Sequence, residues 1–590
     1  MTISSRSAEY GSDVIVDLMK AFGIEYAAFN PGATFRGIHD SIVNYGGNRT
    51  PEVIECCHEE ISVAIAHGYA KATGRPMVAI THNIVGLQHA SMAIFNAWCD
   101  RVPVIVLGGT GPMDSTRRRP WIDWVHTALV QGNLVRDYVK WDDQPYSIAA
   151  VPDSFVRAYR LAVTEPCGPV YLCFDADLQE DRLTEPVAIP DVSRYAPPAP
   201  VPANPEALAR AAKLLAQSTN PVIVAGTVGR NPETVDHLVK LAELLAAPVI
   251  DCGQRFNFPN THPMDLTGAD AEALADADVV LALDVVDLFG ALGSVDKSTR
   301  ALVPHIRPDA KIINISLNDL LVRSWVADYQ KLHPADVPIV ADTSAALPQL
   351  VAACQQIGVD SEAQSARFGA VAARHESLRA EWRARAQAAA GDVPISPAKL
   401  AADVWEVIKD EDWVLTNGTL AGWARRLWEW TKPYQYLGTS GGAGVGYGIG
   451  AALGGALAYR NTDKLCVDLQ NDGDLLYCSS ALWTAAHHRL PLLIVMNNNR
   501  TYYNSEEHQE KVAKARGRDP FDSGNGTRLN DPPVDVAKLA QSFGLYAEGP
   551  IERPEDVEAA IRRAARVVKE QRVPALVDVV TKSVSRQKGE

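Results

Sequence analysis

The sequence has no surplus of positive charge. Its 590 residues include 56 lysines and arginines against 71 aspartates and glutamates, a formal net charge of −15 at pH 7. No long basic block interrupts this balance, so the chain lacks the electropositive surface by which proteins bind nucleic acid or anionic membranes. It also lacks any run of roughly 18 apolar residues, the length of a membrane-spanning helix, and its first residues contain no signal-peptide core. We therefore expect a cytoplasmic protein with no nucleic-acid or membrane partner.

Cysteine is also scarce. The nine cysteines include the adjacent pair Cys56 and Cys57, but none are spaced as Cys-x-x-Cys and they form no regular framework. Free thiols in a reducing compartment are the simplest interpretation, and we expect no structural zinc site. No short-period repeat occurs either, which argues against a repeat architecture.

Short apolar segments recur along the chain and alternate with stretches of helical periodicity, a pattern typical of parallel sheets covered by helices on both faces. At about 100 to 200 residues per domain, the length suits several α/β domains. Prolines crowd the segment after residue 186 and predict an extended linker. The predicted boundaries are 1–186 (N-terminal domain), 187–205 (proline-rich linker), 206–352 (middle domain), 353–395 (helical linker) and 396–590 (C-terminal domain).

In the C-terminal domain, polar side chains follow two neighbouring predicted strands. Asp472 comes directly after the strand KLCVDLQ, and Asn499 follows the strand PLLIVM. Ligands bind beyond the carboxyl ends of parallel strands, and two oxygen ligands at one sheet edge suit a hard cation such as Mg²⁺. Gly473 and the following helix start would let backbone N–H groups approach a phosphate. The alternative is that DG is an ordinary turn and NNN a polar loop.

A glycine-rich stretch at 438–455 precedes this element. It does not have the G-x-G-x-x-G order, so it gives no support to a dinucleotide fingerprint, and close helix packing is its plainer interpretation.

In the N-terminal domain, acidic residues stand where the strand EVIECC meets a helix. A carboxylate here is near a helix N-terminus at a sheet edge, where its pKa can be tuned. Glu59 and Glu60 are the two candidates, and a capping role is the alternative. His82 follows the strand PMVAI at the same edge, although a lone histidine is more often structural.

Taken together, these spaced motifs resemble thiamine-diphosphate-dependent enzymes of the acetolactate synthase, benzoylformate decarboxylase and 2-hydroxyacyl-CoA lyase superfamily. The match covers E-x8-G-Y-A-[KR] from Glu59, the acidic turn at Asp472 and the asparagines ending at Asn499, in family order. One departure is Asn471, which replaces the usual first glycine of the acidic turn. The resemblance implies three doubly wound parallel-sheet α/β domains, two of which bind the cofactor and flank the middle one.

The resemblance also implies roles for individual residues. Asp472, Asn499 and the carbonyl of Thr501 would hold Mg²⁺ against the diphosphate, and Val445 would prop the cofactor in its bent conformation although it is smaller than the usual residue. Glu59 would activate the aminopyrimidine, and the spacing favours it over Glu60. The cofactor-binding set is Glu59, Asn417, Gly418, Thr419, Gly444, Val445, Asp472, Gly473, Asp474, Asn499 and Thr501.

Substrate contacts are expected on both cofactor domains. His82 would relay protons to the bound intermediate, and Ala33 stands where benzoylformate decarboxylases carry a serine. A lid near residues 500–520 would close over the substrate. The candidate substrate contacts are Ala33, Tyr502, Tyr503, Asn504, Glu506 and Glu507, with His508 as a further possibility.

The choice of reaction stays open among three activities. Our preferred prediction is a 2-hydroxyacyl-CoA lyase, a reversible carbon–carbon lyase, because of the chain length, the acidic, tyrosine-rich lid and the basic residues Arg586 and Lys588. The alternatives are a 2-oxo acid decarboxylase, favoured by His82, and an acetolactate-synthase-like carboligase, favoured by RRRPWID at 117–123. A catalytically inactive relative is a fourth possibility, which the intact motifs oppose. The family further implies a homodimer at minimum and a homotetramer as the expected assembly.

Overall fold

The computed structural model describes residues 7–296, 299, 301–320, 329, 331–418 and 421–583. The chain forms two compact units, which are described separately. One comprises the residues up to Ala199 with Ser440–Asn461 and Tyr477–Leu490, and the other comprises the remainder.

The N-terminal domain is built on a six-stranded parallel sheet with strand order β2-β1-β3-β4-β6-β5. Its central strands are almost wholly apolar and buried, as expected when helices cover both faces. The strands are β1 (Tyr26–Phe29), β2 (Glu52–Glu55), β3 (Met77–Thr81), β4 (Val104–Thr110), β5 (Asp142–Asp143) and β6 (Val170–Asp175). The helices are α1 (Gly11–Ala21), α2 (Arg36–Asp40), α3 (Glu59–Thr73), α4 (Ile84–Cys99), α5 (Ile122–Val125), α6 (Val151–Val163) and α7 (Ala176–Glu180).

The glycine-rich stretch turns out to be a helix-packing element. Its second half lies in α16 (Tyr447–Ala458), which packs along α3 within the same unit. A Cβ atom on Gly68 would lie 2.0 Å from the carbonyl oxygen of Ala451, and one on Gly454 would lie 2.1 Å from that of Ile65. The close approach of the two backbones therefore requires glycine at these positions. The unit also contains α18 (Ala481–His487).

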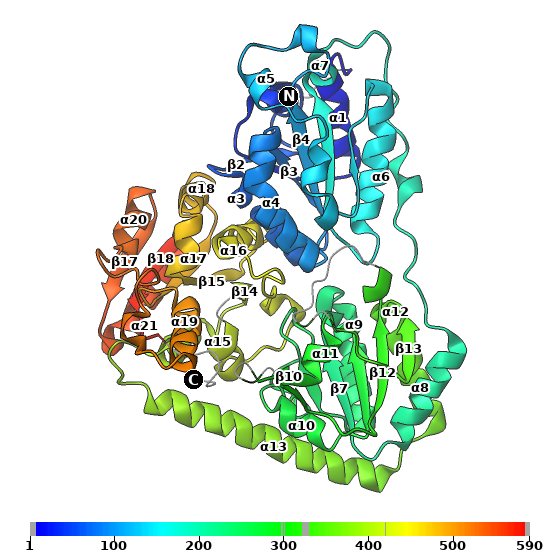
Figure 1. Cartoon of the computed structure of the whole chain (residues 1–590), viewed down its shortest axis with the longest axis vertical. Coiled ribbons are helices and arrows are strands. Elements are labelled where there is room, and N and C mark those ends of the chain that lie inside the picture. Colours follow the sequence, from blue (N-terminus) through cyan, green and yellow to red (C-terminus); the bar gives the residue numbers. More distant parts are fainter. Residues whose placement is uncertain are drawn as a thin grey trace. The chain divides into compact units, whose positions relative to one another are not determined.

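The middle domain has a five-stranded parallel sheet in the order β13-β12-β9-β7-β8. A two-stranded antiparallel hairpin, β10 with β11, accompanies it and was not expected from the sequence. The strands are β7 (Pro221–Ala225), β8 (Val249–Asp251), β9 (Val279–Leu283), β10 (Gly293–Val295), β11 (Leu302–Pro304), β12 (Lys311–Ser316) and β13 (Val337–Val340). The helices are α8 (Pro205–Gln217), α9 (Glu233–Leu245), α10 (Asp270–Ala275), α11 (Leu288–Ala291), α12 (Thr343–Ile357) and the long, unbroken α13 (Ser361–Ala388; Figure 1).

The C-terminal domain contains a second five-stranded parallel sheet, ordered β14-β15-β16-β18-β17. In this sheet β15 lies directly beside β16, so the two strands that precede the predicted metal ligands end at the same edge. The strands are β14 (Trp413–Asn417), β15 (Leu465–Asn471), β16 (Leu492–Asn498), β17 (Tyr546–Ile551) and β18 (Ala575–Val580). The helices are α14 (Pro397–Ile408), α15 (Ala421–Leu427), α17 (Asp472–Tyr477), α19 (Tyr503–Ala515), α20 (Val536–Ser542) and α21 (Val557–Gln571).

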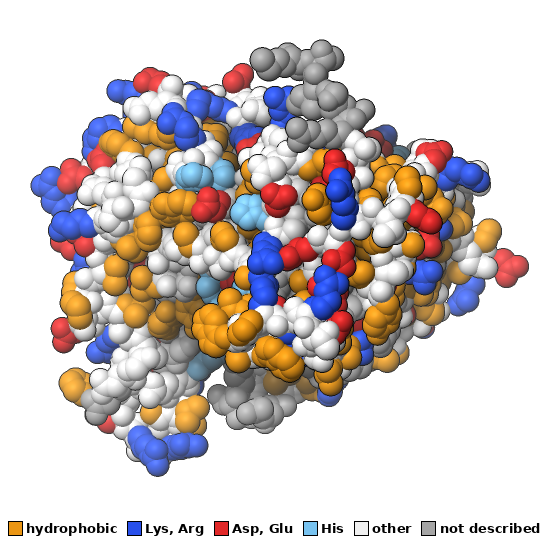
Figure 2. All heavy atoms as spheres, turned by 90° about the horizontal axis from the view of Figure 1, so that it is seen from above, with side chains coloured by type: hydrophobic (Ala, Val, Ile, Leu, Met, Phe, Trp, Pro, Cys, Tyr) orange, Lys and Arg blue, Asp and Glu red, His pale blue; other side chains and the backbone are white. Residues whose placement is uncertain are grey.

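Three parallel-sheet α/β domains therefore confirm the expected fold class, while the exact domain boundaries stay predictions. Figure 2 shows one face of the molecule, on which charged side chains are interspersed among hydrophobic ones. Across the described ranges, none of the helices has the length and apolar character needed to cross a membrane.

Candidate active site

Glu59 is the first residue of α3, and its carboxylate is almost completely buried, with 5% of the side chain exposed. The helix begins here because His58, in extended conformation, caps it: Nδ1 of His58 accepts a hydrogen bond from the backbone N–H of Glu60. One carboxylate oxygen of Glu59, Oε1, accepts a hydrogen bond of 3.3 Å from Nδ2 of Asn30, the residue after β1. A buried carboxylate at a helix N-terminus is favourably placed for proton chemistry.

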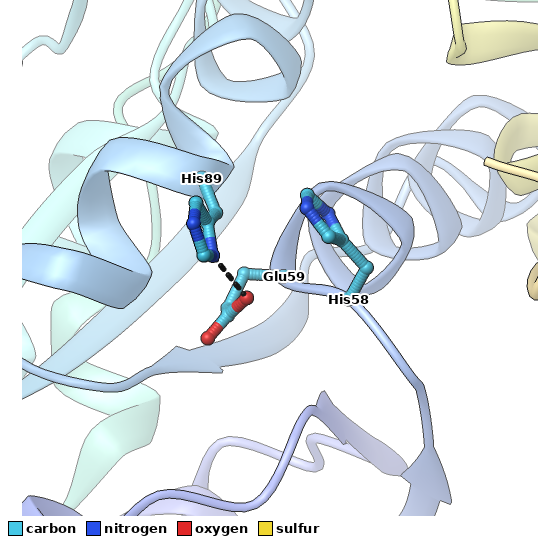
Figure 3. A group of neighbouring side chains, drawn as sticks. All are labelled: His58, Glu59 and His89. Carbon is cyan, nitrogen blue, oxygen red and sulfur yellow. Dashed lines mark hydrogen bonds and ion pairs between the residues drawn. The ribbon is translucent and has the colours of Figure 1, made fainter. Parts of the chain in front are cut away.

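The second oxygen of Glu59 is occupied by a histidine that we did not expect from the sequence. Nδ1 of His89, on α4, lies 3.1 Å from Oε2 of Glu59, and the two side chains point toward one another (Figure 3). Because an ionised carboxylate can only accept hydrogen bonds, His89 is the donor. In the sequence, His89 stands three residues after Gly86, about one turn of a helix. In the structure Gly86 packs against Glu59, so this spacing is the feature that could have pointed to His89.

His82 immediately follows β3 and is held in one tautomer. Its Nδ1 accepts a hydrogen bond of 2.8 Å from the backbone N–H of Asn83 and lies 3.1 Å from the hydroxyl of Thr34. The neutral ring therefore carries its proton on Nε2. Burial lowers the pKa of His82, and the nearby His126 lowers it further. His82 is thus kept neutral with an N–H group available to donate.

His126 and Arg119 join this edge from the segment after β4. The rings of His82 and His126 are 5.6 Å apart in an edge-on arrangement. A guanidinium nitrogen of Arg119 donates to the carbonyl of Ala33 at 3.3 Å, and the same side chain is paired with Asp123. The structure therefore brings Ala33 and His82 into one neighbourhood. His126 went unnoticed in the sequence, although it stands three residues after the RRRPWID segment at 117–123.

In the C-terminal domain, the carboxylate of Asp472 lies where β15 ends and α17 begins. It accepts hydrogen bonds from the backbone N–H groups of Gly473 and Arg500, and burial raises its pKa to about 6. Its Oδ2 atom is buried and has no hydrogen-bond partner among the described residues. Asn499 and Thr501 flank Arg500, so all three predicted metal ligands lie in one place. The orphaned buried oxygen of Asp472, with an amide oxygen on Asn499 and a backbone carbonyl on Thr501, is the donor chemistry that suits a hard cation.

The other asparagines of the NNN element have structural partners. Nδ2 of Asn497 donates to Oδ1 of Asn471 at 3.1 Å, which ties the ends of β16 and β15 together. Nδ2 of Asn498 donates to Asp578 on β18 at 2.9 Å. Asn499 is the residue directly after β16, and its Oδ1 accepts a hydrogen bond of 3.1 Å from the backbone N–H of Thr501.

Position 473 requires glycine because the ring of Tyr502 packs directly against it. A Cβ atom at this position would lie 2.5 Å from the ring of Tyr502, whose hydroxyl donates to the carbonyl of Gly473 at 3.3 Å. Tyr502 therefore packs against the predicted diphosphate turn itself.

The predicted lid is largely the helix α19. Its buried Glu506 accepts hydrogen bonds from the hydroxyl of Thr501 at 2.9 Å and from Arg528 at 3.0 Å. Glu507 is also buried, and Lys511 lies 3.5 Å from its carboxylate. Tyr503 is half-buried, whereas Asn504 and His508 are exposed. Glu506 thus has a structural task in anchoring the lid.

Asn417, a predicted cofactor residue, is the last residue of β14. The side chain of Asn417 is buried and donates to Oδ1 of Asp468 at 3.0 Å, on the neighbouring strand. Burial raises the pKa of Asp468 to about 8. The backbone N–H of Gly418 donates a hydrogen bond of 3.0 Å to the carbonyl of Gly438. Asn417 therefore organises the sheet edge, and Thr419 lies outside the described residues.

The remaining predicted cofactor residues have these surroundings. Oδ2 of Asp474 accepts a hydrogen bond from Gln470 at 2.7 Å. Gly444 donates its N–H to Oδ1 of Asn96 on α4 at 3.2 Å, and a side chain at this position would collide with Met92. The adjacent Val445 is 39% exposed.

Comparison with known proteins follows the three domains. Residues 10–133 match the N-terminal TPP binding domain of thiamine pyrophosphate enzymes, residues 208–350 match their central domain, and residues 416–579 match their C-terminal TPP binding domain. The chain is 25% identical to a probable acetolactate synthase large subunit of Methanocaldococcus jannaschii, over 97% of this chain and 91% of that protein. It is 23% identical to the acetolactate synthase large subunit of Haemophilus influenzae, over 94% and 92%.

Solved structures share the fold. The thiamine diphosphate-dependent 4-hydroxybenzoylformate decarboxylase of Rhodococcus jostii RHA1 has a TM-score of 0.76 at 20% identity, covering 98% of this chain and 99% of that one. The benzoylformate decarboxylase of Polynucleobacter necessarius has the same TM-score at 17% identity, covering 98% and 100%.

Proposed function

Since the chain belongs to the thiamine pyrophosphate enzyme family, we propose that it uses thiamine diphosphate and Mg²⁺ to cleave or form the carbon–carbon bond next to the carbonyl of a 2-oxo acid. The observation that carries the proposal is the buried carboxylate of Glu59 at the start of α3. It is the acid–base group that the cofactor needs at its aminopyrimidine ring.

The bound cofactor would supply a nucleophilic carbon and an electron sink for carbon–carbon cleavage. Asp472, Asn499 and the carbonyl of Thr501 would hold Mg²⁺, and the backbone at Gly473 would accommodate the diphosphate. Glu59 would hold and return a proton at the aminopyrimidine N1′ atom. His82, neutral with its proton on Nε2, would donate to an oxygen of the substrate.

A 2-oxo acid is supported as the substrate class by the relatives, whose names are acetolactate synthases and benzoylformate decarboxylases. The surroundings of Ala33 agree with a small polar substrate, because Arg119 and two histidines gather there. A decarboxylase and a carboligase share every step up to carbon–carbon cleavage, so this chemistry includes both.

The 2-hydroxyacyl-CoA lyase preferred from the sequence is the second candidate. Its support weakens at one point, because Glu506 is held by Thr501 and Arg528. The basic residues Arg586 and Lys588 lie outside the described residues. The four relatives named above are acetolactate synthases and benzoylformate decarboxylases. The half-buried Tyr502 and Tyr503 of the lid still make acyl-CoA the comparison substrate of choice.

The test is carbon dioxide release from pyruvate and benzoylformate by protein loaded with Mg²⁺ and thiamine diphosphate, beside cleavage of a short 2-hydroxyacyl-CoA. We expect cofactor-dependent turnover of a 2-oxo acid, and its reduction by about 100-fold or more in Glu59→Gln, the usual weight of a general acid–base group. Full activity of Glu59→Gln would refute the assigned mechanism. Turnover of the acyl-CoA alone would return the protein to the lyase class.

Assembly and location remain predictions. The homodimer, or homotetramer, follows from the family and is checked by light scattering of the purified protein. The cytoplasmic location is checked by fractionation of cells that express it.

A further inference from the structure

We propose that the hydrogen bond from His89 to Oε2 of Glu59 competes with binding of the cofactor. His89 must move away from Oε2, or share this atom, when the cofactor binds. We call this contact the latch. The contact is a hydrogen bond of 3.1 Å between two side chains on different helices, α4 and α3 (Figure 3). The latch rests on the proposed function, because it matters only if the protein binds thiamine diphosphate.

The surroundings of Glu59 leave one oxygen approachable. Oε1 is covered by Asn30 and by the backbone of α4, where a Cβ atom on Gly86 would lie only 2.9 Å away. Oε2 faces His89, which is 57% exposed, whereas the Glu59 side chain is 5% exposed. A hydrogen-bonding group that arrives from solvent therefore meets Oε2 on the side where His89 lies.

His89 is held in place by a second histidine, His58. The imidazole of His58 stacks on that of His89, with ring centroids 5.0 Å apart and planes at 22°. His58 is itself held by its capping hydrogen bond to the backbone N–H of Glu60. Burial lowers the pKa of His58, which favours a neutral ring beside His89.

The same three side chains could be taken for a metal site, because one ligand atom from each of His58, Glu59 and His89 lies within 4.8 Å of the others. The capping bond argues against it. Nδ1 of His58 accepts the N–H of Glu60, so the neutral ring carries its proton on Nε2 and has no lone pair left for a cation. Two ligands remain, which is fewer than a zinc-type ion requires.

The experiment measures the rate at which apo-protein binds thiamine diphosphate in saturating Mg²⁺, by stopped-flow tryptophan fluorescence and without substrate. His89→Phe keeps a ring to stack on His58 but removes the donor. We expect its association rate constant to rise by about tenfold, the effect of losing one hydrogen bond to a charged group. His89→Asn places an amide N–H near the position of Nδ1 and should bind within about twofold of the wild-type rate.

Asn30→Ala is the matched control, because it removes the donor to Oε1, on the closed side of the carboxylate. It should not accelerate binding. A second readout is deuterium exchange at C2 of the bound cofactor, followed by NMR. His89→Phe should exchange at the wild-type rate, whereas Glu59→Gln should lose the exchange.

Two outcomes would overturn the latch. One is binding of the cofactor by His89→Phe at the wild-type rate. The other is normal binding with slower C2 exchange, since His89 would then take part in the proton chemistry itself. Failure of every 2-oxo acid as substrate would refute the proposed function alone, because neither readout uses substrate. Failure of the wild-type protein to bind thiamine diphosphate would refute both.

Discussion

The imidazole ring of His126 stands edge-on to that of His82, with centroids 5.6 Å apart and planes at 78°. Nδ1 of His126 is buried and has no hydrogen-bond partner among the residues that the structure describes. The two histidines come from the segments after β3 and β4, neighbouring strands whose carboxyl ends meet at one edge. Their proximity means that a charge on one ring disfavours a charge on the other.

Replacing His126 should therefore change the pH at which His82 titrates. His126→Gln removes the ring that helps to lower the pKa of His82, so this pKa should rise toward its ordinary value. If neutral His82 is the active form, the acidic limb of the kcat/KM profile moves to higher pH in the variant. The measurement is that profile, together with NMR titration of the His82 ring.

The matched control is His39→Gln, on α2. It should leave the acidic limb where it is in the wild type. A wild-type profile for His126→Gln as well would show that the two rings are not coupled.

Asp472 is expected to be indispensable for the binding of Mg²⁺ and thiamine diphosphate. Ligands present at 100 times their Kd stabilise a protein by about 2.7 kcal/mol, so Mg²⁺ with thiamine diphosphate should raise the Tm of the wild type by several degrees. Asp472→Asn removes the charge of the orphaned carboxylate and should abolish this rise while leaving the apo-protein folded. Asp463→Asn, in the exposed loop before β15, is the control and should keep the full rise. A normal rise in Asp472→Asn would remove Asp472 from the metal site.

The sequence was sufficient for much of this architecture. Buried parallel strands are runs of apolar residues, and polar side chains directly after them must lie at the sheet edge, so the positions of Asp472, Asn499 and Glu59 were predictable. The pairing of β15 with β16 then brought the first two of these residues together.

Other features depend on contacts between segments far apart in the chain, which local patterns do not encode. His89 meets Glu59 only because α4 packs on α3, and His126 meets His82 only because β4 lies beside β3. Asn417 lies at the expected edge of the sheet, but its side chain donates a hydrogen bond to Asp468 on the next strand. The three alternative substrates differ in side chains around the site rather than in the motifs that bind the cofactor.

Acid should destabilise the fold through His488. This half-buried histidine accepts a hydrogen bond of 2.8 Å from the backbone N–H of Glu55, and burial together with His487 lowers its pKa to about 4. The unfolded chain has an ordinary histidine pKa of about 6.5 and binds the proton first. This contribution to stability is therefore complete above about pH 6.5 and is lost as the pH falls toward 4.

The expected loss is about 1 to 2 kcal/mol, less than the full pKa difference implies, because solvent screens a partly exposed ring. Urea unfolding at pH 7 and pH 4.5 measures it. His488→Gln keeps an acceptor for Glu55 but does not titrate, so its stability should fall less between the two pH values. His487→Gln should show an intermediate fall, because His487 helps to lower the pKa of His488. An equal fall in all three proteins would assign the acid sensitivity elsewhere.

The contact of α3 with α16 should tolerate no side chain at Gly68. In Gly68→Ala the new Cβ would lie 2.0 Å from the carbonyl oxygen of Ala451, which is backbone and cannot move aside. Separating the helices should cost about 1 to 3 kcal/mol of the free energy of unfolding. The control is Gly369→Ala on the long helix α13, where a Cβ meets nothing within 4 Å. Alanine is the better helix former, so this variant should gain about 0.5 to 1 kcal/mol. Urea unfolding of both proteins therefore separates the two effects of one chemical change, and equal stabilities would show that α3 and α16 do not pack as closely as described.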